Sequence, residues 1–264
     1  MALATPILRA ITVLASSLIL LAGPPKALAD NGTPQAESAA YFREKFQEAQ
    51  ARYRGAPGES AAAWQFGRAC FELAEFPTNR SERASLGEAG MAACRLAIAR
   101  ASNSAPAHYY LGLNLGQLAR TKGPSALKLV DQMERAFIRT RELDERLDYA
   151  GPDRHLGVIY RDAPPIVSVG SRSRARACLQ RAVKLAPQYP ENGLNLIEAY
   201  VKWGERADAS RELQALTNAW PAARTNLTGV AWAASWVDWE ERLQKLRKKL
   251  RQPKPGLGAP QAQP

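Results

Sequence analysis

The chain has 264 residues, of which 36 are Lys or Arg and 25 are Asp or Glu, and its formal net charge is +11 at pH 7. Its three cysteines are too few for a disulfide scaffold and cannot all pair within one chain. Such a positive charge would favour nucleic acid as a partner in the cytoplasm. The first residues predict export, however, so nucleic acid is not expected.

Residues 1–29 have the parts of a secretory signal peptide. Arg9 precedes the apolar run ITVLASSLILLAG, and Ala27-Leu28-Ala29 is a small-x-small cleavage site. The run is about a dozen residues, short for a membrane span of roughly 20, so an uncleaved anchor is the weaker alternative. No cysteine lies near the cut, so a lipoprotein is not expected. We expect cleavage after Ala29 and a periplasmic or secreted protein.

Residues 30–58 are expected to form a polar leader and an N-terminal capping helix. Apolar residues recur there at spacings of 4, 3 and 4, through Phe42, Phe46, Ala49 and Tyr53. One such stripe is typical of a helix with a single buried face. We expect this helix to cover the open end of a repeat stack.

Residues 59–223 carry the strongest pattern in the chain. Pro187 and Pro221 are 34 residues apart, and each is expected to end a segment in which small and large apolar residues occupy matching positions. This is the register of the tetratricopeptide repeat (TPR), a pair of antiparallel helices. The matching positions of the last two pairs are Leu156, Gly157, Tyr160, Ala175, Leu179 and Ala182, then Leu196, Tyr200, Ala209, Leu213 and Leu216.

Two earlier pairs follow the pattern more loosely. Their positions are Trp64, Gly67, Phe71, Gly90, Cys94 and Ala97, then His108, Leu111, Gly112, Leu115, Met133, Phe137 and Thr140. Small residues let the two helices approach closely, and pairs must stack because one pair cannot bury its own apolar face. The sequence therefore predicts an all-α, TPR-like right-handed superhelical solenoid of about four helix pairs with a C-terminal capping helix. An irregular helical bundle is the alternative.

An insertion, RDAPPIVSVGS at 161–171, separates the two helices of the third pair. A minimal repeat turn has no use for its apolar residues, Pro164, Pro165, Ile166, Val167 and Val169. They are expected to form an apolar lip on a ligand cavity or a contact between protomers. The alternative is that the segment folds back onto its own hairpin.

Residues 224–251 are expected to form an amphipathic capping helix whose apolar side carries Trp232, Trp236, Trp239, Leu243, Leu246 and Leu250. A dimer seam is the alternative for this stripe. The end of the helix is basic, which favours membrane headgroups, envelope polymers or an acidic partner, or simply suits the helix dipole. Residues 252–264 have too little apolar content to fold and are expected to be disordered.

The sequence offers little chemistry. Only His108 and His155 could act as near-neutral acids or bases, and no catalytic or metal-binding motif is present. The side chains of Asp153, Arg154 and His155 are expected to point apart on one helix. No enzyme activity, cofactor or metal is therefore expected. Cys70 and Cys94 are expected to remain thiols, because their predicted axial offset of roughly 10 Å exceeds disulfide reach.

The first helices of the pairs are expected to line a concave binding face. Two positions per helix, one and five residues after the Trp-equivalent position, give Tyr109, Leu113, Arg154, Val158, Leu194 and Glu198, with Arg161 at the edge. An arginine among apolar neighbours suits a carboxylate with an apolar tail. Removing Arg154 should then weaken binding without destabilising the fold. The alternatives are that Leu113 and Leu194 are packing residues and that Arg154 pairs with Asp153 or Glu198.

Residues 151–205 resemble the T-component family of periplasmic TPR proteins associated with tripartite ATP-independent periplasmic (TRAP) transporters. The resemblance lies in the GP-x-R-x-LG-x-x-Y opening, the proline-containing insertion ending in SVG and the LAPQYPEN turn. It implies association with a periplasmic solute-binding protein and a hydrophobic or organic-acid-like ligand. The first expectation remains a secreted scaffold that binds a protein partner through its concave face, and the TRAP-associated subunit is the alternative. The oligomeric state is left open.

Overall fold

The computed structural model describes residues 32–77 and 79–252. The predicted signal peptide, its expected cleavage site at Ala29 and the tail from residue 253 lie outside these ranges. In the described part the chain forms ten α-helices and a 3-10 turn, η1 (Gly123–Ala126), and no strand. The helices are α2 (Pro34–Gly55), α3 (Ser60–Ala74), α4 (Arg80–Arg100), α5 (Ala105–Ala119), α6 (Leu127–Leu143), α7 (Leu147–Asp162), α8 (Arg172–Leu185), α9 (Pro190–Trp203), α10 (Arg206–Asn226) and α11 (Val230–Arg251).

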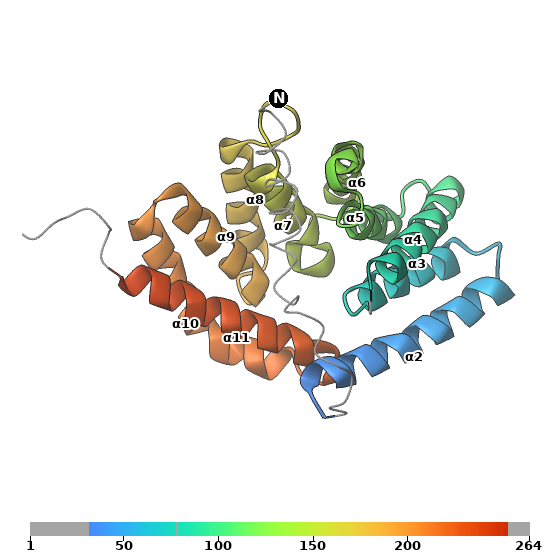
Figure 1. The fold of residues 1–264 in the computed structure, drawn as a ribbon, viewed down its shortest axis with the longest axis horizontal. Helices are drawn as coiled ribbons and strands as arrows, with labels where there is room; N and C mark the ends of the chain where they lie inside the picture. Colours follow the sequence, from blue (N-terminus) through green and yellow to red (C-terminus); the bar gives the residue numbers. More distant parts are fainter. Residues whose placement is uncertain (1–31, 78, 253–264) are drawn as a thin grey trace, which may run out of the picture.

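The predicted helix pairs are α3–α4, α5–α6, α7–α8 and α9–α10, and they follow one another around an arc (Figure 1). A glycine lies at three of the crossings. A Cβ added to Gly67 would lie 2.3 Å from Cys94 Sγ, and one added to Gly157 would lie 2.6 Å from the side chain of Leu179. Gly112 meets Phe137 in the same way, at 2.7 Å. The small residues are therefore required by close helix approach, as the sequence predicted.

Helix α2 packs on α3 through the predicted stripe. The Phe46 and Tyr53 rings lie 5.5 and 5.1 Å from the Phe66 ring, and Phe42 stacks on Phe76. At the other end, the Trp-rich side of α11 is buried against α9 and α10. The exposed fractions of Trp239, Leu243 and Leu246 are 2%, 3% and 6%. The stripe is therefore covered within one chain.

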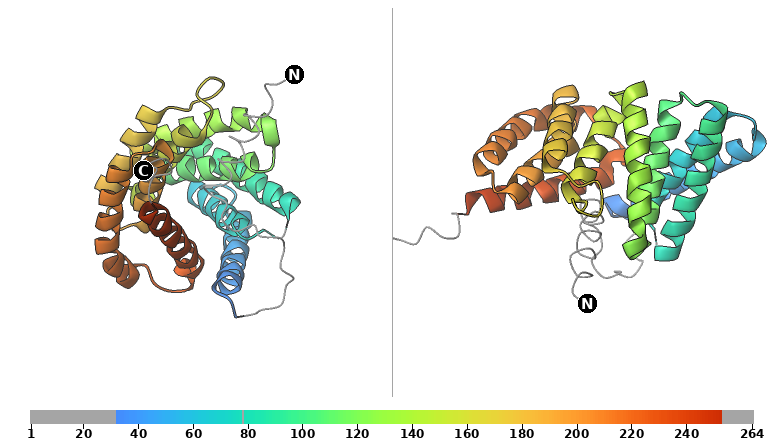
Figure 2. Two further views of the ribbon diagram at one scale, coloured as in Figure 1. Left: turned by 60° about the vertical axis from the view of Figure 1, so that its left-hand side comes forward. Right: turned by 90° about the horizontal axis from the view of Figure 1, so that it is seen from above.

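The first and last described helices also meet each other (Figures 1 and 2). Ser38, the fully buried residue of α2, donates from its hydroxyl to the Val230 carbonyl at 2.9 Å. The same hydroxyl accepts from the Ala234 amide at 3.3 Å. Because these partners are almost 200 residues apart in sequence, the two ends of the helix stack are tied together.

One predicted boundary is wrong. Pro187 does lie between helices, but Pro221 lies inside α10, which continues to Asn226, and α11 begins only at Val230. Proline removes one helical hydrogen bond and usually ends a helix. Here the buried stripe of Ala209 and Leu216 continues to Ala223 beyond the proline, so packing outweighs the lost bond.

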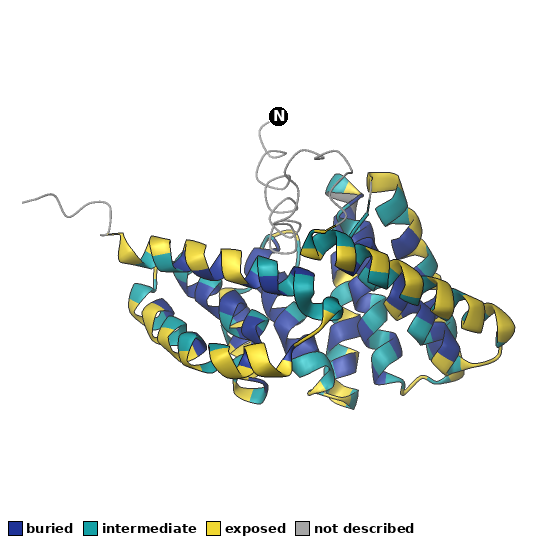
Figure 3. Ribbon diagram, turned by 90° about the horizontal axis from the view of Figure 1, so that it is seen from below, coloured by how far each residue is buried: buried dark blue, intermediate teal, exposed yellow. Residues whose placement is uncertain are grey.

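The insertion forms a loop between the end of α7 at Asp162 and the start of α8 at Arg172. Val169 folds back onto the core around Tyr160, whereas Ile166 is 94% exposed and Val167 is 49% exposed. The fold-back alternative thus holds for Val169 alone. Figure 3 shows how burial is concentrated between the helices of each pair.

The three cysteines are free and buried, as expected. Within the two described ranges, no helix is both long and apolar enough to cross a bilayer.

Candidate functional site

Helix α7 begins with an unusual turn. Asp148, Tyr149 and Ala150 have φ angles of 49°, 55° and 62°, in the left-handed region that such residues rarely occupy. Each such residue costs roughly 1–3 kcal/mol and persists only where its surroundings enforce it. The next residue, Gly151, is pressed against Tyr109, since an added Cβ would lie 2.3 Å from the Tyr109 hydroxyl.

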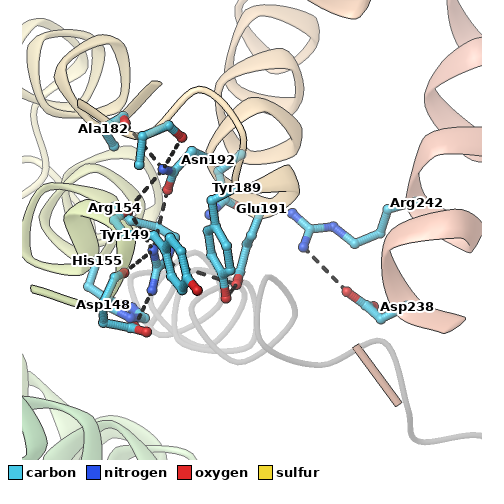
Figure 4. Close-up of polar contacts among 12 residues, drawn as sticks. Asp148, Tyr149, Arg154, His155, Ala182, Tyr189, Glu191, Asn192, Asp238 and Arg242 are labelled. Carbon is cyan, nitrogen blue, oxygen red and sulfur yellow. Dashed lines mark hydrogen bonds and ion pairs between the residues drawn. The ribbon is translucent and has the colours of Figure 1, made fainter. Parts of the chain in front are cut away.

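Arg154 and Asn192 hold this turn in place (Figure 4). Arg154 Nη1 donates to the carbonyls of Asp148, at 2.9 Å, and Tyr149, at 3.3 Å. Asn192, on α9, donates to the same Tyr149 carbonyl at 2.9 Å. Two side chains from different helices therefore bind the carbonyls that the left-handed turn exposes.

The charge of Arg154 is also paired. Its Nη2 lies 2.5 Å from Asp148 Oδ2, and its guanidinium lies 4.7 Å from the centre of the Tyr189 ring. Glu191 is a more distant partner, with its Oε2 3.9 Å from Arg154 Nε. The Arg154 side chain is only 2% exposed. Arg154 is therefore a buried structural hub, and its partners are neither Asp153 nor Glu198.

The Tyr109 hydroxyl joins Arg154 to His155. It donates to Asp148 Oδ2, accepts from Arg154 Nη2 at 3.2 Å and lies 3.1 Å from His155 Nε2. The expectation that Arg154 and His155 point apart is wrong, because Tyr109 on the neighbouring helix lies between them. Asp153 does point away, with its carboxylate within 3.3 Å of Arg141 and 2.9 Å of Arg181.

Burial controls the protonation of this cluster. Burial, and then the Arg154 charge, lower the pKa of His155 well below 6.5, so its ring is neutral at pH 7. Burial and the neighbouring Asp148 raise the pKa of Tyr109 well above 10, so its hydroxyl keeps its proton. The cluster is thus held by hydrogen bonds to neutral rings around one ion pair.

A second network joins α11 to the concave side of α9. Arg242 donates from Nε to Glu198 Oε1 at 2.8 Å and from Nη2 to Asn195 Oδ1 at 2.6 Å. Arg161 lies on the other side of Glu198, with its Nη1 3.4 Å from Oε2. Burial acts to raise the pKa of Glu198, but Arg242 and Arg161 more than offset it and hold the pKa below its usual value.

The predicted concave-face residues are buried except for Glu198, whose side chain is 26% exposed. Leu113 and Leu194 pack in hydrophobic cores, and Val158 is only 6% exposed. Arg161 and Glu198 do come together, but beneath Arg242 of α11. The prediction of an open face is wrong at these positions, because α11 lies over α9.

An open stretch of the same face lies on α3 and α5. The Trp64 and Tyr110 rings stack, with centroids 6.1 Å apart and planes 5° apart. The Arg68 guanidinium lies 5.9 Å from the Tyr110 ring centre, and its side chain is 52% exposed. Phe71 also contacts Tyr110, at 6.5 Å between ring centres. We call Trp64, Arg68, Phe71 and Tyr110 the aromatic-cation cluster.

This cluster adjoins the Arg154 hub. The Tyr110 ring contacts the ring of Tyr109, which belongs to that hub, with 5.3 Å between ring centres. The cluster was not among the residues predicted from the sequence, although the sequence carries a signal for it. Gly67 lies at a helix crossing, as Gly112 and Gly157 do. Trp64 lies three residues before Gly67, just as Tyr109 lies three before Gly112 and Arg154 three before Gly157. Aligning the glycines would have included Trp64 and Arg68.

The described residues contain no group of three His, Cys, Asp or Glu side chains placed to hold a metal ion. The side chains that α3, α5 and α7 bring together are aromatic rings, arginines and carboxylates.

No family model and no curated protein matches the chain. Among solved structures, the model is similar to TTC0263, a thermophilic TPR protein of Thermus thermophilus, with a TM-score of 0.58 and 15% sequence identity. The match covers 81% of this chain and 97% of that one. The chain has a TPR fold. This confirms the predicted right-handed superhelical solenoid of antiparallel helix pairs.

A second solved structure, yeast Tom70, matches with a TM-score of 0.30 and 8% identity over 90% of this chain and 70% of that one. This score is too low to add to the comparison of TPR folds.

Proposed function

We propose that this chain is an exported TPR scaffold that holds a segment of a partner protein on its concave face. The proposal rests above all on the aromatic-cation cluster of α3 and α5. Arg68 is half-exposed beside the stacked Trp64 and Tyr110 rings. The corresponding residue of α9, Glu198, is instead bound by Arg242 of α11. Tyrosine, tryptophan and arginine are the residues that most often dominate binding energy at protein interfaces.

The cluster favours a partner segment that carries a carboxylate next to an apolar side chain. Arg68 Nε pairs with Glu72 at 2.7 Å, and the rest of its guanidinium is available to an acidic group. The Trp64 and Tyr110 rings offer apolar area beside it.

The test compares binding by three forms of the mature chain. Arg68→Ala should weaken capture of the partner from a periplasmic extract by about 1.5–3 kcal/mol, the range for a hydrogen bond to a charged group. Arg95→Ala is the matched control, since Arg95 is an exposed arginine on the outer helix α4. A photo-crosslinker at Trp64 should link the partner directly. Equal capture by all three forms would move the binding face elsewhere.

Export is supported by the signal-peptide pattern of residues 1–29. Intact-mass measurement of the exported protein tests it, and a chain that begins at Asp30 is expected. A mature chain that retained residues 1–29 would instead support the uncleaved anchor.

The second candidate is the TRAP-associated subunit, beside a solute-binding protein, that the resemblance implies. One observation favours it: buried Arg154 Nε has no hydrogen-bond acceptor among the described residues. An organic carboxylate bound beside this nitrogen would supply one. Calorimetry with aliphatic and aromatic carboxylates tests this, and no binding heat with any of them would exclude it.

A further inference from the structure

The exposed large apolar side chains of the described part are confined to one loop. Ile166 is 94% exposed and Val167 is 49% exposed, both at the tip of the loop between α7 and α8. Figure 2 shows this loop, in yellow, projecting beyond the ends of the helices. The tip lies far from the aromatic-cation cluster in sequence, and the proposed function does not use it.

The base of the loop is firmly held. The Ser171 amide donates to the Tyr160 carbonyl at 2.8 Å, and the Ser168 amide donates to the Pro164 carbonyl at 3.1 Å. Val169 packs on the core, and a Cβ on Gly170 would lie 2.0 Å from the Ala163 carbonyl oxygen. The tip is therefore presented on an ordered base, with two prolines restricting its backbone.

The segment that follows the tip is basic, and Arg172 and Arg174 lie in the first turn of α8, next to the loop. Residues 163–190 contain no Asp or Glu but include Arg172, Arg174, Arg176, Arg181 and Lys184. The four arginine side chains are 33–54% exposed, and each pairs with a carboxylate outside α8: Arg172 and Arg176 with Glu205, Arg174 with Glu134, and Arg181 with Glu145. Exposed ion pairs contribute little to stability, so an anionic surface can compete for these arginines.

We propose that this loop is a membrane-contact site, at which Ile166 and Val167 enter the interface of an anionic bilayer and the nearby arginines meet its headgroups. Two side chains on a convex tip bury far too little area for a stable protein interface. A small apolar tip beside cations is sufficient for reversible attachment to an anionic leaflet, where each basic residue adds to the attraction.

The experiment is flotation of the mature chain with vesicles of phosphatidylglycerol and phosphatidylethanolamine, and with vesicles of phosphatidylcholine alone. The wild type should bind the anionic vesicles, and its binding should fall as salt rises. Ile166→Asp should lower the partition coefficient at least tenfold. Ala51→Asp is the matched control, because it adds the same charge at an exposed position of α2. Wild-type chain that stays with the soluble fraction, or equal binding by Ile166→Asp, would overturn the proposal.

A second measurement locates the tip. An Ile166→Cys variant carries one accessible thiol, because Cys70, Cys94 and Cys178 are buried. An environment-sensitive fluorophore on that thiol should shift to the blue when anionic vesicles are added, and an unchanged spectrum would contradict insertion. Sedimentation without lipid tests whether the tip instead contacts a second copy of the chain. A wild-type dimer that Ile166→Asp converts to a monomer would make the tip a protomer contact and overturn the membrane site.

Discussion

Arg154 occupies a position where binding and folding are difficult to separate. It pairs with Asp148, binds two carbonyls of the left-handed turn and touches the Tyr109 hydroxyl, all while almost fully buried. Breaking a buried pair leaves an uncompensated charge, which costs more than the pair itself contributes.

We predict that Arg154→Ala lowers the free energy of unfolding by about 3–5 kcal/mol. This replaces the sequence-based expectation that Arg154 can be removed without loss of stability. Urea unfolding measures the change, with the exposed Arg95→Ala as the control. A loss below about 1 kcal/mol, within the usual effect of a surface substitution, would show that Arg154 does not hold the turn.

His155 gives the fold a pH dependence. Its pKa is lowered in the folded state from 6.5, so the unfolded chain binds the proton more readily. Stability from this residue is therefore fully present above pH 6.5 and falls as the pH drops below that value. The slope is at most about 1.4 kcal/mol per pH unit for one proton.

The prediction is that the wild type loses stability between pH 6.5 and 5 relative to His155→Gln, whose amide takes up no proton. Unfolding free energies of both proteins are measured at several pH values, and those of the variant are subtracted from those of the wild type. The subtraction removes the pH dependence that comes from the carboxylates, because both chains contain them. Parallel curves for the two proteins would contradict a neutral, buried His155.

At the scale of the helix, the decisive feature is close approach at the crossings. Ala182 has no exposed surface, and its carbonyl accepts from Asn192 at 3.1 Å. Ala182→Glu would place both extra volume and a charge at this crossing. We predict a loss of about 3 kcal/mol or more.

Thermal unfolding measures this loss. Ser173→Glu is the control, because it adds the same charge at an exposed position of the same helix. If the two variants unfolded at the same temperature, Ala182 would not be a crossing residue.

The sequence predicts those features of the helices that depend on neighbouring residues, and it does not predict those that depend on contacts with other helices. Gly157 and Ala182 predict a helix crossing, because only a small residue fits between two closely packed helices. The turn at Asp148 has no such signal, since it is enforced by Arg154 and by Asn192 of another helix. Likewise Pro221 predicts a helix end, and only the packing of Ala223 shows that the helix continues.

The candidate site was harder to predict for the same reason. Arg161 and Glu198 were placed on the concave face by their repeat positions, but their cover comes from Arg242. Arg242 lies 44 residues after Glu198, and no local pattern connects them. The open residues Trp64 and Arg68 were predictable in principle from the glycine slots.

For the whole molecule, the contact between α2 and α11 ties the two ends of the stack. Ser38→Ala removes the acceptor of the Ala234 amide. We predict faster hydrogen exchange at Ala234 and its neighbours in α11, with exchange in α5 unchanged. Mass spectrometry of the exchanged peptides measures this, and unchanged exchange in α11 would mean that the two ends do not depend on Ser38.

Helix α11 lies over α9 and leaves the aromatic-cation cluster of α3 and α5 as the more exposed part of the concave face. A double-mutant cycle with Arg242→Met and Glu198→Gln tests the packing of α11 on α9, by urea unfolding of the wild type, both single variants and the double variant. Residues in contact are expected to couple by about 0.5–3 kcal/mol. We predict coupling in that range, and single effects that add with no coupling would contradict the docking of α11 on α9.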